Sequence, residues 1–146
     1  MMATLNKQAA EALEPVSENV HACTDITGFG FVGHLHEMMV ASKLAATISL
    51  DALPLLEGVW ELAVAGVTPG KTSELIDWAQ GFMIFGKAVS EEDSAVWQTI
   101  VCDPQTSGGL LLSMSKDAAA RYLELCPTAV QVGSVCEGSA GQVQFV

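Results

Sequence analysis

Apolar residues recur at helical spacing in several stretches of the chain. The pattern predicts helices over residues 3–14, 28–44, 54–66, 91–100 and 116–125, with a short helical turn over 75–79. In the second helix, Val32, Leu35, Met38 and Met39 are expected to face the core.

Polar residues and one proline mark where these helices should begin. Thr27, Ser90 and Ser115 each place a hydroxyl just before a helical pattern, so each is expected to accept a hydrogen bond from a free backbone N–H. Pro54 is expected to open the third helix, because its fixed φ suits the first turn.

Alternating or continuous apolar runs predict strands between the helices. The candidates are residues 20–23, 46–50, 110–114, 129–135 and 142–146, the last two forming a hairpin across the turn at 137–141. Residues 80–90 fit neither pattern. Helices and strands do not alternate strictly, so we expect an α+β fold with a mixed, mainly antiparallel sheet covered by helices. Without repeats or a linker, residues 1–146 should form one domain.

Composition and charge narrow the range of partners. The chain is 50% hydrophobic and 16% charged, which is typical of a globular protein. Its net charge of −11 makes nucleic acid and an anionic membrane surface unexpected partners, since both require clustered Lys and Arg. An acidic protein can still hold a nucleotide when Mg²⁺ bridges carboxylate and phosphate.

The four cysteines indicate a reducing compartment. Cys23, Cys102, Cys126 and Cys136 form no C-x-x-C pair, and polar residues near the start interrupt any leader-like apolar run. No stretch reaches the length of a membrane span. We therefore expect a cytoplasmic protein whose thiols are buried as small hydrophobic groups.

One segment, residues 23–34, combines a carboxylate, two hydroxyls and three glycines in a turn that leads into a helix. The small residues next to Asp25 allow the backbone to come close to a ligand that its carboxylate binds. Three interpretations of Asp25 stay open from its chemistry alone: a turn residue bonded to nearby N–H groups, a metal ligand, or a general base.

The same segment spells G-x-G-x-x-G through Gly28, Gly30 and Gly33, with Asp51 at about the position of the acid in a dinucleotide-binding motif. Two features oppose that interpretation. The preceding strand is polar, whereas a central parallel strand should be apolar, and Asp25 would repel a pyrophosphate.

A second polar segment, residues 102–109, precedes an apolar strand. Thr106, Ser107, Gly108 and Gly109 could present hydroxyls and N–H groups to an anion, or could simply form a tight turn. The three histidines, His21, His34 and His36, do not predict a metal site, because the last two point to different sides of a helix and His21 on a strand is expected to pack.

The two segments together resemble a known family. His-Ala-Cys-Thr-Asp-Ile-Thr-Gly-Phe-Gly at residues 21–30, with Gly33 and His34 after it, is similar to a signature of selenophosphate synthetases (selenide, water dikinases). Residues 103–111, Asp-Pro-Gln-Thr-Ser-Gly-Gly-Leu-Leu, resemble a second signature, and residues 2–6 and 132–135 also look familial. The likeness spans nearly the whole chain in the right order.

The resemblance covers only the carboxy-terminal half of that family, whose fold is of the aminoimidazole-ribonucleotide-synthetase type. It implies a missing amino-terminal half with the ATP-binding segment, a reactive Cys or selenocysteine, a Lys and further metal-binding Asp residues. The implied reaction makes selenophosphate from ATP, selenide and water with Mg²⁺. Asp25 stands at the position of a family metal ligand, so it is expected to bind metal, while this chain holds no catalytic residue and is inactive alone.

The resemblance also implies a homodimer of the full-length protein, and it leaves open whether Thr106–Gly109 approach phosphate or only turn the chain. The chain departs from the family at residues 69–74, where Pro-Gly-Lys-Thr-Ser-Glu stands in place of a Gly-Gly-Thr-x-Arg-Asn-like run without its Arg. Two alternatives remain: another ATP-dependent enzyme of the superfamily, and a non-enzymatic nucleotide-binding module using the Gly28–Gly33 turn.

Overall fold

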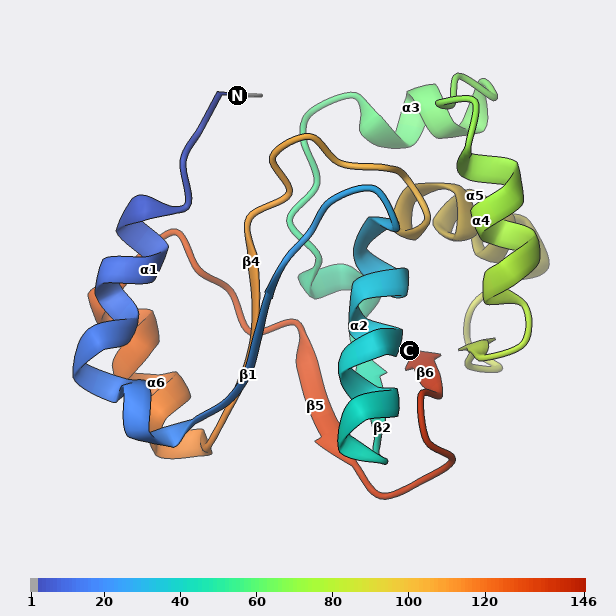
Figure 1. The fold of residues 1–146 in the computed structure, drawn as a ribbon. Helices are drawn as coiled ribbons and strands as arrows, with labels where there is room; N and C mark the ends of the chain where they lie inside the picture. The colour runs from blue at the N-terminus through green and yellow to red at the C-terminus, as the bar shows by residue number, and fades with distance from the viewer. Residues whose placement is uncertain (1–2) are drawn as a thin grey trace.

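Helices and strands mix along the chain as the apolar pattern predicts. The computed structural model describes residues 3–146 (Figure 1). Its helices are α1 (Lys7–Leu13), α2 (Gly30–Ser42), α3 (Val59–Val64), α4 (Thr72–Ala79), α5 (Glu91–Val101) and α6 (Lys116–Leu125), with 3₁₀ turns η1 (Glu14–Asn19) and η2 (Leu50–Ala52). Its strands are β1 (Val20–Asp25), β2 (Ala45–Ile48), β3 (Met83–Phe85), β4 (Leu110–Met114), β5 (Gly133–Cys136) and β6 (Val143–Phe145).

The strands divide into two sheets. β1 and β4 form an antiparallel pair, and a second sheet has the order β3-β6-β2-β5. Within it β2 runs antiparallel to β5 but parallel to β6, and β3 is parallel to β6. The α+β class with a mixed sheet is confirmed.

The predicted hairpin of the last two strands is wrong. β5 and β6 do not pair with each other but flank β2 on opposite edges. The turn between them passes over the end of β2, where the Gly141 N–H donates to the Leu44 carbonyl at 2.9 Å. This arrangement satisfies both edges of β2 and buries Val143 and Phe145 completely.

The larger hydrophobic core lies between α2 and the four-stranded sheet. Val32, Leu35, Met38 and Met39 of α2 are all buried there, as predicted, and pack with Phe145 and others. Met83 of β3, in the stretch that fits neither sequence pattern, completes this core.

A second, smaller core lies on the other side of the β1–β4 pair. It joins α1, η1 and α6 through Ala12, Val16, Ala118, Tyr122 and Cys126. In Figure 1 the β1–β4 pair stands between α1 and α6 on one side and α2 on the other. Both cores are thus built from this chain's own residues.

The structure tests the predicted helix starts. The Ser90 and Ser115 side chains accept from the Asp93 and Ala118 N–H groups, at 3.0 and 3.4 Å, as expected of caps. The third helix begins at Val59 rather than at Pro54, after Gly58 at φ +83°. No helix within residues 3–146 combines the length and apolar character that crossing a bilayer requires.

Candidate functional site

Asp25 lies at the end of a strand, not in a loop as the sequence suggests. It is the last residue of β1, opposite Leu110, and its side chain is exposed. Among residues 3–146 the Asp25 carboxylate accepts no hydrogen bond and forms no ion pair. Its oxygens are therefore free to bind a group brought from outside the domain.

The two sequence motifs are joined in space. Beyond the β1–β4 ladder the Ile26 N–H donates to the Gly109 carbonyl at 3.0 Å, and the Gly108 N–H donates to the Ile26 carbonyl at 3.2 Å. The Gln105 N–H reaches the Thr27 carbonyl at 3.0 Å. We call residues 25–30 and 103–109 together the motif junction.

Close backbone contacts explain two glycines of the motif junction. A Cβ on Gly108 would lie 2.6 Å from the Ile26 carbonyl oxygen. Gly30 has φ +65°, and a Cβ there would lie 2.8 Å from the Val101 carbonyl oxygen at the end of α5. Only glycine fits both positions without displacing backbone.

Thr27 does not cap α2 with its side chain. The helix begins at Gly30 with Phe29 at the cap position and no side-chain cap bond. The Thr27 carbonyl instead accepts from the Gly30 N–H at 3.1 Å, and the Thr27 hydroxyl lies 3.0 Å from Nε2 of His34. Because Gly30 contacts the end of α5, the helix begins at Gly30. This contact outweighs the preference of the Thr27 hydroxyl for the cap position.

The dinucleotide-binding alternative does not fit the topology. Among residues 3–146, β1 pairs only with β4, antiparallel, whereas β2 belongs to the other sheet, so no parallel β-α-β unit of this part of the chain surrounds the three glycines. Gly33 lies inside α2, where a Cβ would approach the Trp78 ring to 3.0 Å. Its role is to let α4 pack on α2.

The second motif is a structured turn. Gln105 Nε2 donates to the Asp103 carboxylate at 2.7 Å, and the Ser107 hydroxyl donates to the Thr4 carbonyl at 2.7 Å. Burial raises the pKa of Asp103, opposed by the Gln105 hydrogen bond. Thr106 stays exposed, and Gly109 takes φ +83°.

The histidines do not gather around Asp25 to form a metal site. His34 is buried, and Nδ1 of His36 lies 2.7 Å from the Gly141 carbonyl while its ring stacks on Phe82 at 3.5 Å. His21 is exposed, so its predicted packing role is wrong. Within residues 3–146 no three His, Cys, Asp or Glu side chains converge to hold an ion.

The cysteines divide into two kinds. Cys102 and Cys126 are buried, and burial raises the pKa of Cys102 to about 12. Cys23 and Cys136 are exposed, so the prediction that all four are buried is wrong. Partial burial and the nearby Asp25 charge raise the pKa of Cys23, which keeps its thiol protonated at neutral pH and argues against a nucleophile.

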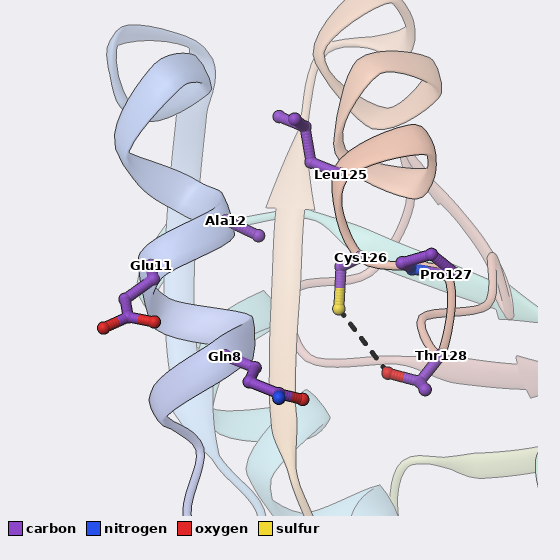
Figure 2. Close-up of a pocket in the computed structure, with 7 residues that line it drawn as sticks. All are labelled: Gln8, Glu11, Ala12, Leu125, Cys126, Pro127 and Thr128. Atoms are coloured by element: carbon purple, nitrogen blue, oxygen red, sulfur yellow. Dashed lines mark hydrogen bonds between the residues drawn. The ribbon is translucent and has the colours of Figure 1, made fainter.

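A pocket lies away from the motif junction, between α1 and α6. We call it the α1–α6 pocket; it has a volume of about 410 Å³. Figure 2 shows its lining, with the Cys126 thiol 3.6 Å from the Thr128 hydroxyl. The lining residues are Gln8, Glu11, Ala12, Leu125, Cys126, Pro127 and Thr128. The sequence gives no sign of this pocket, because its walls are about 110 residues apart in the chain.

A smaller pocket of about 130 Å³ lies beneath α3. Leu62 and Val67 form one wall, and Ile100 and Asp103 form the other. It therefore connects α3 to the start of the second motif.

Comparison with known proteins places the chain in a described family. Residues 1–146 match the family "AIR synthase related protein, C-terminal domain". A selenide, water dikinase of Caldanaerobacter subterraneus subsp. tengcongensis is 36% identical over 144 residues, covering 99% of this chain and 40% of that protein. One from Aeromonas salmonicida is 41% identical over 128 residues, covering 88% of this chain and 34% of that protein.

Solved structures share the fold at low identity. A hydrogenase maturation protein, HypE, solved in complex with ATP, has a TM-score of 0.62 at 17% identity, over 98% of this chain and 37% of that chain. A thiamine-monophosphate kinase from Stenotrophomonas maltophilia gives 0.51 at 15% identity, over 89% of this chain and 32% of that chain. The chain thus spans about a third to two fifths of the proteins that it matches.

Proposed function

The chain belongs to the family of AIR synthase related proteins, C-terminal domain, and we propose that it is the carboxy-terminal domain of a selenide, water dikinase. Residues 1–146 form that domain, and an amino-terminal half supplies the ATP-binding segment and the nucleophile. The full enzyme makes selenophosphate, AMP and phosphate from ATP, selenide and water, as a homodimer.

One observation carries the proposal: 36% identity over 144 residues to a protein of that name. The motif junction supports it, because the two motifs that resemble the family signatures are hydrogen-bonded to each other at Ile26, Thr27 and Gly108. The HypE likeness supports the fold alone, since identity there is 17%.

Asp25 is the residue that we assign to metal binding. Its carboxylate is exposed and has no partner among residues 3–146, which fits a single oxygen ligand to Mg²⁺, an ion that usually keeps several waters and takes few protein ligands. The remaining ligands come from the amino-terminal half, since residues 3–146 contain no group of three or more His, Cys, Asp or Glu side chains that could hold the ion alone. When bound, Mg²⁺ neutralises charge on the transferred phosphoryl group.

The rest of the motif junction positions that carboxylate. The Ile26 and Gly108 hydrogen bonds fix the backbone that follows Asp25, and the bond from Ser107 holds the segment before α1 against the same loop. Thr106 is exposed, and its hydroxyl makes no hydrogen bond among the described residues 3–146, so we assign it to contact with a phosphate oxygen.

The test grafts this chain into a working enzyme. In the grafted enzyme, this chain replaces the matching domain of the Caldanaerobacter relative, and selenide-dependent formation of AMP from ATP is measured. Asp25→Asn should lower turnover at least about 100-fold, because it removes a charged ligand at the site of phosphoryl transfer.

The matched control is Asp51→Asn, another exposed acid, in η2, that the dinucleotide alternative would require. It should leave turnover unchanged. A folded, ATP-binding graft that makes no selenophosphate contradicts the proposed function and favours another ATP-dependent enzyme of the superfamily. Full activity of Asp25→Asn contradicts the metal role.

A further inference from the structure

Five exposed apolar side chains cluster within a short stretch around α3. Their exposed fractions are 39% for Leu55, 53% for Leu56, 52% for Leu62, 62% for Val64 and 61% for Val67. The other large apolar side chains exposed in residues 3–146 are scattered along the chain. We call this cluster the α3 surface. Exposed apolar side chains gathered in one segment are typical of a contact with another protein or domain.

The inner side of α3 is already occupied. Trp60 packs edge-to-face on Trp97 of α5 with ring centroids 5.4 Å apart, and Val59 and Ala63 line the small pocket above α5. Leu62 lines the same small pocket and is nevertheless 52% exposed, and Val64 is 62% exposed. The domain therefore does not use these side chains for its own core.

The α3 surface is continuous with the motif junction. The pocket of about 130 Å³ joins Leu62 and Val67 to Asp103, and Asp103 begins the loop that is bonded to the turn after Asp25. In Figure 1, α3, the turn after β1 and the loop before β4 lie at the same end of the molecule.

We infer that the α3 surface is the docking face for the ATP-binding half of the enzyme. The inference rests on the proposed function, because a half that shares a metal ion with Asp25 must approach this end of the domain. The relatives contain such a second domain, since this chain covers only 32–40% of their length and its family is a C-terminal domain. Exposed Glu57 and Glu61 border the surface, so the covering face should be apolar with basic side chains at its rim.

Thiol labelling tests the inference directly. Leu62→Cys is made in a background with the exposed Cys23 and Cys136 changed to Ser, and its maleimide labelling rate is compared between the isolated chain and the grafted enzyme. Val130→Cys is the matched control, with 50% exposure against 52% for Leu62. In the grafted enzyme Leu62→Cys should label at least about tenfold more slowly, with Val130→Cys unchanged, because interface cores exclude solvent.

Equal labelling of Leu62→Cys in both proteins overturns the docking face. Protection that appears in the isolated chain as its concentration rises assigns the surface to a second copy and also overturns it. Selenide-dependent turnover of the same grafted enzyme separates the two proposals. Turnover without protection defeats only the docking face, and protection without turnover defeats only the proposed activity.

A second measurement needs no grafted enzyme. Leu62→Glu in the isolated chain should change Tm by no more than about 2 °C, as for an exposed side chain outside the core. A fall of more than about 10 °C would show that α3 belongs to the domain's own core and would overturn the inference.

Discussion

The motif junction and the α1–α6 pocket present opposite kinds of surface. The motif junction borders only the smaller of the two pockets described above, through Asp103, but it carries an exposed carboxylate that is unpaired within residues 3–146, on backbone fixed by Gly30 and Gly108. The α1–α6 pocket is roomy, at about 410 Å³, yet its lining includes no residue of either motif. A site that a second protein domain completes does not need a cavity of its own. Pocket size is therefore a poor guide to function in this domain.

The largest expected effect on stability comes from breaking the motif junction with Gly108→Ala. The added Cβ would lie 2.6 Å from the Ile26 carbonyl oxygen and 2.8 Å from the Ile26 Cβ, so backbone must move. We expect a loss of about 1–3 kcal/mol in the free energy of unfolding, measured by urea denaturation.

The control for that prediction is Gly28→Ala, where a Cβ meets nothing within 4 Å. It should change the free energy of unfolding by less than about 1 kcal/mol. If both variants lose the same amount, the close approach of Gly108 is not what fixes the turn after Asp25.

Local rules predict much of this fold. Helical spacing identifies the buried face of α2 through Val32, Leu35 and Met39, and hydroxyls identify the starts of α5 and α6. These features depend on residues close together in the chain. Pairing of β5 and β6 with β2 depends on distant segments, so a hairpin was the wrong expectation.

In the candidate site, too, the sequence predicts the features that depend on neighbouring residues but not those that depend on distant ones. Sequence identifies Asp25 and the second motif, but not that residues about 80 apart meet through Ile26 and Gly108. Thr27 shows why: its hydroxyl suits a cap, yet the contact of Gly30 with α5 moves the helix start past it. The sequence does not identify the α3 surface either, because the helical spacing of its apolar residues predicts a face that is buried in the core.

A moderate effect is expected on the pocket side of the comparison, from Tyr122→Phe. The Tyr122 hydroxyl donates to the Ala9 carbonyl at 3.0 Å and so ties α6 to α1. Removing it should cost about 1 kcal/mol while leaving turnover of the grafted enzyme intact. Loss of turnover would mean that the smaller core controls the motif junction.

The same variant changes the response to alkaline pH. Burial, with smaller effects of Cys126 and Cys23, raises the pKa of Tyr122 to about 12. The unfolded chain therefore releases this proton first, and stability falls as pH rises from about 10 toward 12. Urea midpoints for Tyr122→Phe should fall less steeply over that range, and Cys102 and Cys23, whose pKa values are also raised, contribute to the remaining slope.

The smallest effect is expected from Gln8→Ala, and it tests the comparison most sharply. Gln8 lines the α1–α6 pocket, is exposed and makes no side-chain hydrogen bond within residues 3–146 (Figure 2). Its removal should change the free energy of unfolding by less than about 0.5 kcal/mol, as for an ordinary surface position, and should leave turnover unchanged. A loss of turnover approaching that of Asp25→Asn would place the working site in the pocket and would reverse the roles assigned to the two regions.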